Sequence, residues 1–215
     1  NRLDLTFRDG RYPDPYYATR RASTLVVGVS CTPAKTCFCH LWDADEARFG
    51  YDLFLQDIGG KYLVSISSAE AANVLEAACS PREADDEERI AFRHATRARQ
   101  RAFNPDIPDI QEVGMLMDAF HKDAFWEELG SRCLACGACA SVCPTCFCFD
   151  IRDVLDPDGR VGRRERVQDA CTNPQFALVA GGHNFRPDGR NRVRHRMYHK
   201  LNGFLANHDR MLCVG

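Results

Sequence analysis

Four closely spaced cysteines constrain this chain more than any other feature of its sequence. The spacing is C-x2-C-x2-C-x3-C-P, and it is carried by Cys133, Cys136, Cys139, Cys143 and Pro144. Gaps of two residues let a tight loop direct three thiolates toward one small inorganic cube, while the fourth cysteine points toward a neighbouring cube. Bacterial ferredoxins hold [4Fe-4S] clusters with this spacing. The run therefore predicts iron–sulfur ligation and a protein that carries electrons.

Zinc is the alternative metal, because C-x2-C pairs also form zinc knuckles. A zinc site uses two such pairs, or one pair with histidines, and it requires neither a third evenly spaced cysteine nor a following proline. Gly137 lies inside the run, where it lets the backbone fold close to the sulfurs without a Cβ clash. The spacing favours iron–sulfur clusters over zinc.

The twelve cysteines of the 215-residue chain gather in short clusters and are not spread as in a disulfide framework. In a chain of this size without a signal peptide at its start, that distribution indicates metal ligation in a reducing compartment, and we expect the cytoplasm. The composition, 45% hydrophobic and 27% charged, is that of a soluble globular protein. No apolar run reaches the ~18 to 20 residues of a membrane span, so we expect no membrane partner.

The ends of the sequence predict a longer protein. The sequence starts at Asn1 without a methionine and stops two residues after Cys213, within what reads as a second cysteine motif. We therefore expect a fragment, with further cluster ligands beyond residue 215.

Positive charge is concentrated in residues 160–200, which contain ten Arg or Lys against three Asp or Glu. A basic stretch can bind nucleic acid, and a zinc-stabilised nucleic-acid-binding module that uses this stretch is the alternative function. It can equally neutralise the thiolates of nearby clusters or meet an acidic partner. Because cluster ligands lie on both sides of it and no nucleic-acid motif is present, we favour the second interpretation and expect no nucleic-acid partner.

The pattern of apolar residues predicts an α+β chain with two domains. Residues 1–105 form an N-terminal α+β domain, and residues 106–215 form a ferredoxin-like 4Fe-4S dicluster domain that is split by a long insert. Residues 1–67 read as mostly β, because short apolar runs are separated by turns such as Gly59-Gly60. The strands are predicted over residues 25–30, 51–56 and 61–67.

Helix signals follow these strands and lead into the cysteine run. Ser67 and Glu70 read as a capping box for a helix over 69–78, and Ser80-Pro81 opens a second helix that continues to about residue 100. Apolar residues at helical spacing then predict one further helix with a buried face, which anchors the cysteine run. They are Val113, Leu116, Met117, Phe120, Ala124 and Leu129.

Beyond the cysteine run, three local predictions follow from composition and turn residues. The sequence predicts a short helix over 149–155, a turn over 156–159 and a helix start at Asn173-Pro174.

The string Thr-Cys-Phe-Cys occurs twice, over 36–39 and over 145–148. In extended backbone the two cysteines of C-x-C point to opposite faces, so both reach one metal only in a turn. The thiols of Cys31, Cys37 and Cys39 predict a third cluster that a later cysteine completes, and the alternative is that they are buried free thiols. The candidates for the completing ligand are Cys146, Cys148 and Cys171.

Histidines form a weaker pattern. His195 and His199 are spaced i, i+4, which on a helix can bind zinc. No third ligand lies at motif spacing and the flanking arginines oppose cation binding, so we expect these histidines and His183 to donate hydrogen bonds near cluster sulfurs. The sequence has no Walker loop, no G-x-G-x-x-G and no G-x-S-x-G, so it predicts neither a nucleotide site nor a catalytic nucleophile.

Several stretches of the sequence are shared with one known family. They are residues 14–21, 31–39, 133–150 (CLACGACASVCPTCFCFD), 169–171, 181–186 and 192–200. Through them the chain resembles the iron–sulfur beta subunit of cytoplasmic sulfhydrogenase-type nickel–iron hydrogenases. The same family includes the A subunit of anaerobic sulfite reductase, and both carry a 4Fe-4S dicluster domain. The resemblance covers nearly the whole chain.

The resemblance implies a subunit that catalyses nothing by itself. Such a subunit relays electrons between a flavin subunit that exchanges with NAD(P)H and a catalytic subunit that reduces protons, sulfur or sulfite. Cys133, Cys136 and Cys139 would hold one cube, completed by a cysteine beyond residue 215. Cys143 and Cys213 would hold a second cube with further ligands there, so the resemblance implies two [4Fe-4S] clusters.

Overall fold

The computed structural model describes residues 2–42, 44–103, 112–209 and 211–212 of the chain. The described residues fall into two compact units, which we call unit 1 (residues up to 103) and unit 2 (residues from 112). The domain boundary predicted between residues 105 and 106 lies outside the described residues. No described helix has both the length and the apolar character that a membrane crossing requires.

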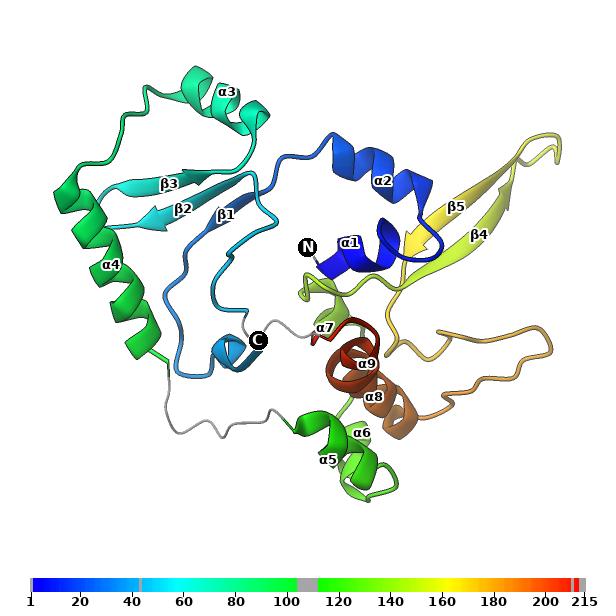
Figure 1. Cartoon of the computed structure of the whole chain (residues 1–215). Coiled ribbons are helices and arrows are strands. Elements are labelled where there is room, and N and C mark those ends of the chain that lie inside the picture. The colour runs from blue at the N-terminus through cyan, green and yellow to red at the C-terminus, as the bar shows by residue number, and fades with distance from the viewer. Residues whose placement is uncertain (1, 43, 104–111, 210, 213–215) are drawn as a thin grey trace. The chain divides into compact units, whose positions relative to one another are not determined.

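The sheet of unit 1 has three short strands in the order β1-β2-β3 (Figure 1). β1 (Val27–Val29) runs parallel to β2 (Leu53–Asp57), and β2 runs antiparallel to β3 (Tyr62–Ile66). Gly28 is required in β1, because a Cβ at that position would lie 2.5 Å from Cδ2 of the Phe54 ring. The bounds of the three strands agree with the predicted ranges 25–30, 51–56 and 61–67 to within about two residues.

Two helices precede this sheet, so the prediction that residues 1–67 are mostly β is wrong for its first third. The helical segments of unit 1 are α1 (Arg2–Phe7), α2 (Pro15–Ala22), a 3-10 turn (Cys39–Trp42), α3 (Ala69–Ala78) and α4 (Asp86–Arg101). At the start of α2, the Asp14 carboxylate accepts hydrogen bonds from the backbone N–H groups of Tyr16 (2.9 Å) and Tyr17 (3.1 Å). Pro15 follows this N-cap at the first helical position, which is a helix signal that the sequence contained.

The bounds of α3 confirm the predicted helix, but its cap differs by one residue. Ser68, not Ser67, is the N-cap, and its hydroxyl accepts a hydrogen bond from the Ala71 N–H (3.3 Å). The next helix, α4, begins at Asp86 and not at Pro81. Its start is fixed by a different capping box, which prevails over the Ser80-Pro81 signal because it satisfies two backbone N–H groups at once.

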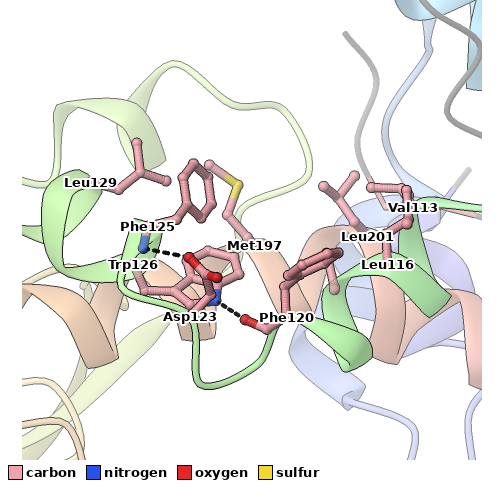
Figure 2. A pocket seen from close by; sticks show the side chains of 10 residues that line it. Val113, Leu116, Phe120, Asp123, Phe125, Trp126, Leu129, Met197 and Leu201 are labelled. Atoms are coloured by element: carbon pink, nitrogen blue, oxygen red, sulfur yellow. Dashed lines mark hydrogen bonds between the residues drawn. The ribbon is translucent and has the colours of Figure 1, made fainter.

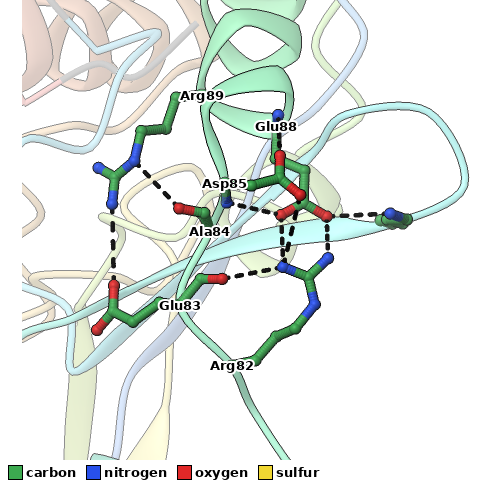
Figure 3. A network of polar contacts seen from close by, with 7 residues as sticks. Arg82, Glu83, Ala84, Asp85, Glu88 and Arg89 are labelled. Carbon is green, nitrogen blue, oxygen red and sulfur yellow. Dashed lines mark hydrogen bonds and ion pairs between the residues drawn. The ribbon is translucent and has the colours of Figure 1, made fainter.

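That capping box is formed by Asp85 and Glu88 and extends into a charge network (Figure 3). The Glu88 backbone N–H donates to the Asp85 carboxylate (2.9 Å), and the Asp85 N–H donates to the Glu88 carboxylate (3.2 Å). The Glu88 carboxylate also accepts hydrogen bonds from Lys61 (3.0 Å) and Arg82 (2.6 Å). These hydrogen bonds from Lys61, Arg82 and the Asp85 N–H lower the pKa of Glu88 to about 2.

Unit 2 contains more helix than unit 1 and a separate two-stranded ribbon. Its helices are α5 (Val113–Ala119), α6 (Phe125–Ser131), α7 (Ala138–Ser141), α8 (Gly189–Tyr198), a π-helical turn (His199–Gly203) and α9 (Phe204–His208). The single anchoring helix predicted before the cysteine run is therefore wrong, because α5 ends and α6 begins within it. The Trp126 indole N–H donates to the Phe120 carbonyl (2.9 Å) in the turn between them, which buries Trp126.

The side chains around this turn line an apolar groove of about 480 Å³ (Figure 2). Met197 of α8 and Leu201 of the π-helical turn complete the groove. Leu116 and Phe120, which were predicted to be buried, are half exposed, because the break after α5 turns them to this open side.

The segment 149–155 is a strand and not the predicted helix. β4 (Phe149–Leu155) pairs antiparallel with β5 (Gly162–Gln168), and the Arg164 guanidinium bonds the Asp153 carboxylate across the ribbon (2.7 Å). The predicted turn over 156–159 is confirmed and ends with Gly159 at φ +68°. The predicted helix start at Asn173-Pro174 is wrong, because residues 171–177 form consecutive turns.

Two glycines bring α6 and α8 into close contact. A Cβ on Gly130 would lie 2.3 Å from the Arg190 backbone nitrogen, and a Cβ on Gly189 would lie 2.5 Å from the Gly130 carbonyl oxygen. Backbones can approach this closely only where neither residue has a side chain. The crossing places the start of α8 directly beside the helix that leads into the cysteine run.

Candidate iron–sulfur cluster site

The cysteine run follows α6 as a compact loop. The Cys133 N–H donates to the Gly130 carbonyl at the end of that helix (3.2 Å). Ala135 (φ 52°) and Gly137 (φ 72°) both adopt left-handed backbone conformations, and Gly137 is the N-cap of α7. A Cβ on Gly137 would lie 3.0 Å from the Asn173 side-chain oxygen, so glycine suits both the conformation and the space.

The four cysteines of the run are free thiols that differ in exposure. Cys136 and Cys139 are exposed, whereas Cys133 and Cys143 are partly buried. In the described ranges no three His, Cys, Asp or Glu side chains are arranged closely enough to hold a metal ion. Cys213, the predicted first cysteine of the second motif, lies outside the described residues.

A lysine from the π-helical turn contacts the last cysteine of the run. The Lys200 ammonium donates hydrogen bonds to Cys143 Sγ (3.3 Å) and to Thr145 Oγ1 (2.8 Å). Lys200 follows these two residues in the sequence by 57 and 55 positions, respectively. Burial raises the pKa of the Cys143 thiol, but its contacts with the side chain and the backbone of Thr145 and the charge of Lys200 outweigh it and bring the pKa to about 6. Thr145 Oγ1 in turn donates to the Leu212 carbonyl (2.8 Å). Leu212, the residue before Cys213, is thereby tied to the cysteine run.

An arginine one turn earlier on α8 contacts two further cysteines. Arg196 donates from Nη1 to Cys146 Sγ (3.3 Å) and from Nη2 to the backbone carbonyl of Cys139 (2.9 Å). Arg196 and Lys200 are spaced i, i+4, so one helix face presents two cationic donors to the cysteine segment. The sequence predicted that the basic stretch could neutralise cluster thiolates, but no local pattern indicates which of its side chains contact a sulfur, so these contacts were missed.

The histidines do not take the predicted role. In the part of the chain that the structure describes, no histidine donates a hydrogen bond to a cysteine sulfur, and Arg196 and Lys200 make these contacts instead. His195 and His199 line a small cavity of about 20 Å³. Burial, with the nearby charge of Arg186 and the neighbouring His199, lowers the pKa of His195 to about 4, so a neutral imidazole is present there.

The same small cavity collects the three later cysteines. Cys146, Cys148 and Cys171 all line it. Interaction between the Cys148 and Cys171 thiols lowers the pKa of Cys148 to about 7 and, together with burial, raises the pKa of Cys171. The structure therefore groups the three residues that sequence reasoning named as alternatives.

Unit 1 contains the other cysteines that were predicted to be ligands, Cys31, Cys37 and Cys39. Cys37 Sγ accepts a hydrogen bond from the Ala34 N–H (3.3 Å) in a tight turn, and Cys39 begins the 3-10 turn. Burial raises the pKa of Cys39, as do the charges of Asp45, Cys37 and Cys31. A third cluster that includes these three thiols stays a prediction.

The surroundings of the cysteine sulfurs in unit 2 favour thiolates, although no three ligating side chains of the described residues converge on one point. The run offers free thiols on a loop whose backbone is compact at Ala135 and Gly137. Cationic donors face the sulfur of Cys143 in the run and that of Cys146 just after it. Such donors compensate the negative charge that ligated thiolates carry.

Comparisons with known proteins agree with this chemistry. Residues 132–215 match the family described as 4Fe-4S dicluster domain. The chain is 35% identical over 189 residues to the protein named sulfhydrogenase 2 subunit beta of Pyrococcus furiosus, an alignment that covers 87% of this chain and 56% of that relative. The chain thus spans about half the length of the curated relative that it matches. No solved structure matches the chain.

These findings confirm the resemblance predicted from the sequence. Residues 132–215 are similar to the 4Fe-4S dicluster domain, and most of the chain is similar to a sulfhydrogenase beta subunit. The mixed α/β content of the prediction is confirmed as well.

Proposed function

We propose that this iron–sulfur protein is an electron-relay subunit of a multi-subunit oxidoreductase and has no catalytic activity by itself. The dicluster domain and the hydrogenase beta subunit that the chain resembles support an electron-transfer role. The observation that carries the proposal is the face of α8 and the following turn, where Arg196 and Lys200 contact the sulfurs of Cys146 and Cys143. Cations placed against cysteine sulfurs favour thiolates, and thiolates are the ligands of iron–sulfur clusters.

We assign the cluster ligands from the spacing of the run and the family resemblance. Cys133, Cys136 and Cys139 hold one cluster with a cysteine beyond residue 215, and Cys143 and Cys213 take part in a second. When bound, the clusters supply one-electron redox chemistry, while the protein sets their spacing and potential. Within this assignment α6 fixes the first cysteine of the run, and Lys200 holds the last one in place.

The proposed partners stand at the two ends of the relay. One is a flavin subunit that exchanges electrons with NAD(P)H, and the other is a catalytic subunit. The name of the relative supports hydrogen or sulfur as the terminal chemistry, and sulfite is the alternative that the family resemblance leaves open. We propose the cytoplasm as the location, because free clustered thiols require a reducing compartment.

Isolation of the untagged native complex under anaerobic conditions tests this function. The expected preparation is brown, bleaches with dithionite, contains iron and acid-labile sulfide in equal amounts, and includes a flavoprotein. A nickel–iron subunit among its neighbours identifies hydrogenase as the terminal enzyme, and a sirohaem subunit identifies sulfite reductase. A single chain that oxidises NAD(P)H unaided contradicts the relay.

The same preparation tests the alternative function. A colourless protein that contains zinc and binds DNA with a steep salt dependence would support the nucleic-acid module. Intramolecular pairing weighs against it, because Arg164 bonds Asp153 and Arg190 bonds Glu127 within unit 2. Those charges of the basic stretch are already compensated inside the chain.

A further inference from the structure

Lys200 is a lysine in the interior of unit 2. Only 6% of the residue is exposed, and its ammonium group is within hydrogen-bond distance of Cys143 Sγ (3.3 Å) and Thr145 Oγ1 (2.8 Å). Removing an ammonium group from water costs free energy unless an opposite charge compensates it. A buried lysine therefore calls for an anionic partner.

No carboxylate fills that role in the described residues. Their ion pairs include no Asp or Glu oxygen within 4.0 Å of the Lys200 ammonium, whereas Lys61 in unit 1 has Glu88 at 3.0 Å. Thr145 is neutral, so the Cys143 sulfur is the contact that can carry negative charge. The ammonium thus faces a sulfur that the proposed function makes a cluster ligand.

The position of the ammonium is fixed from two sides. The Lys200 carbonyl accepts a hydrogen bond from the Leu212 N–H (3.0 Å), and the Leu212 carbonyl accepts one from Thr145 Oγ1 (2.8 Å). Leu212 is fully buried. Leu212 thus links the backbone of Lys200 to Thr145, the residue that the Lys200 ammonium contacts beside the sulfur.

We propose that Lys200 is the built-in counter-ion of the cluster that Cys143 ligates and that its charge raises the reduction potential of that cluster. This inference rests on the proposed function. Addition of one electron makes a thiolate-ligated cluster more negative by one unit, and a fixed positive charge in a poorly hydrated site favours that state. Lys200 is therefore a tuning residue, and the two clusters of the domain respond to it unequally.

Redox titration of the full-length subunit, followed by electron paramagnetic resonance, tests the inference. In Lys200→Met we expect the reduction equilibrium of one cluster to fall by about tenfold, which is 59 mV for a one-electron step, while the other cluster changes less. Lys200→Arg keeps the charge and should keep the potential near that of the wild type. Arg160→Met is the matched control. Arg160 is 85% exposed on the β4–β5 turn, so this variant also loses one positive charge, but at a side chain that contacts no cysteine sulfur in the described residues.

Lys200→Gln separates charge from packing, since it keeps a polar group of similar length. Equal potentials in Lys200→Met, Lys200→Gln and wild type, with full iron content, overturn the inference. Loss of one cluster from both neutral variants but not from Lys200→Arg supports it, because a counter-ion is then needed to hold the anion. Loss of a cluster from Lys200→Arg as well contradicts it. A wild-type protein without iron would instead overturn the proposed function.

Discussion

The two units contain charge networks that differ in whether they are closed. In unit 1 the Glu88 carboxylate is surrounded by Arg82, Lys61 and a backbone N–H, so each charge of the network has a partner within the chain (Figure 3). In unit 2 the buried Lys200 ammonium has a sulfur and a hydroxyl as partners and no carboxylate among the described residues. The network of unit 1 is complete within the chain, whereas Lys200 of unit 2 is left to the cysteine sulfur for which we propose cluster ligation.

The largest expected effect is loss of a cluster when one of the proposed cysteine ligands in unit 2 is removed. Cys136→Ser should remove about four iron atoms per chain, because the thiolate is a direct ligand in the proposed assignment. Iron and sulfide analysis of the anaerobic protein measures it. Cys79→Ser is the control, since the Cys79 thiol donates to the Leu75 carbonyl at the end of α3 and lies outside the cysteine groups. Equal iron content in both variants would refute the assignment of Cys136.

A second prediction tests whether unit 1 also contains a cluster site. If Cys31, Cys37 and Cys39 ligate a third cluster, Cys37→Ser should remove about four iron atoms and leave the signals of the other clusters intact. Iron analysis combined with electron paramagnetic resonance distinguishes this loss from that in Cys136→Ser. Unchanged iron in Cys37→Ser would show that the three residues are free thiols.

The third prediction concerns the helix crossing that positions α8. Gly130→Ala should destabilise unit 2 by about 1–3 kcal/mol, because its Cβ would lie 2.3 Å from the Arg190 nitrogen and the backbones must separate. Denaturant unfolding under anaerobic conditions measures the change. Gly203→Ala is the matched control, since the nearest atom to its Cβ, the Tyr198 carbonyl oxygen, is 3.7 Å away. A similar loss in both variants would mean that the crossing is not the cause.

The smallest expected effect is local and depends on pH. The pKa of Glu88 is lowered to about 2, below the ~4.3 of an unfolded chain, so its contribution is present above about pH 5 and is lost as the pH falls toward 2. Hydrogen exchange over residues 82–90 should be faster in Glu88→Gln than in wild type at pH 6, and the ratio should decrease at pH 3. Glu83→Gln is the control, because the Glu83 side chain is 99% exposed. A ratio that does not change with pH would exclude Glu88 as the titrating group.

How far the sequence predicted the site depends on whether the signal was local. The strands of unit 1 and the bounds of α3 follow from short patterns and were confirmed. The iron–sulfur character of the cysteine run also follows from a short pattern and agrees with the family match of residues 132–215, whereas its individual ligands stay a prediction. The break between α5 and α6 was missed because the apolar spacing continues through it, while the Trp126 hydrogen bond to Phe120 ends the first helix.

Competition between local signals explains the other errors. The Asp85–Glu88 box prevailed over Ser80-Pro81, and pairing with β5 made a strand of residues 149–155.

The contact between Lys200 and Cys143 joins residues 57 positions apart, and no local pattern distinguishes this lysine from the arginines around it. The sequence therefore pointed to His195 and His199, which lie beside Arg196 and Lys200, whereas in the described part of the chain Arg196 and Lys200 are the side chains that donate to cysteine sulfurs.

The bond between Thr145 and Leu212 has a consequence for biosynthesis. Its partners are 67 residues apart, so at about 5–20 residues per second a ribosome needs about 3–13 s to synthesise the second after the first. During that interval Cys143 has left or is leaving the ribosome without its lysine, and we expect its thiol to be accessible to assembly factors and to oxidants alike. Nascent chains stalled before Lys200 should therefore react with an alkylating reagent at Cys143 faster than chains that extend well past Leu212.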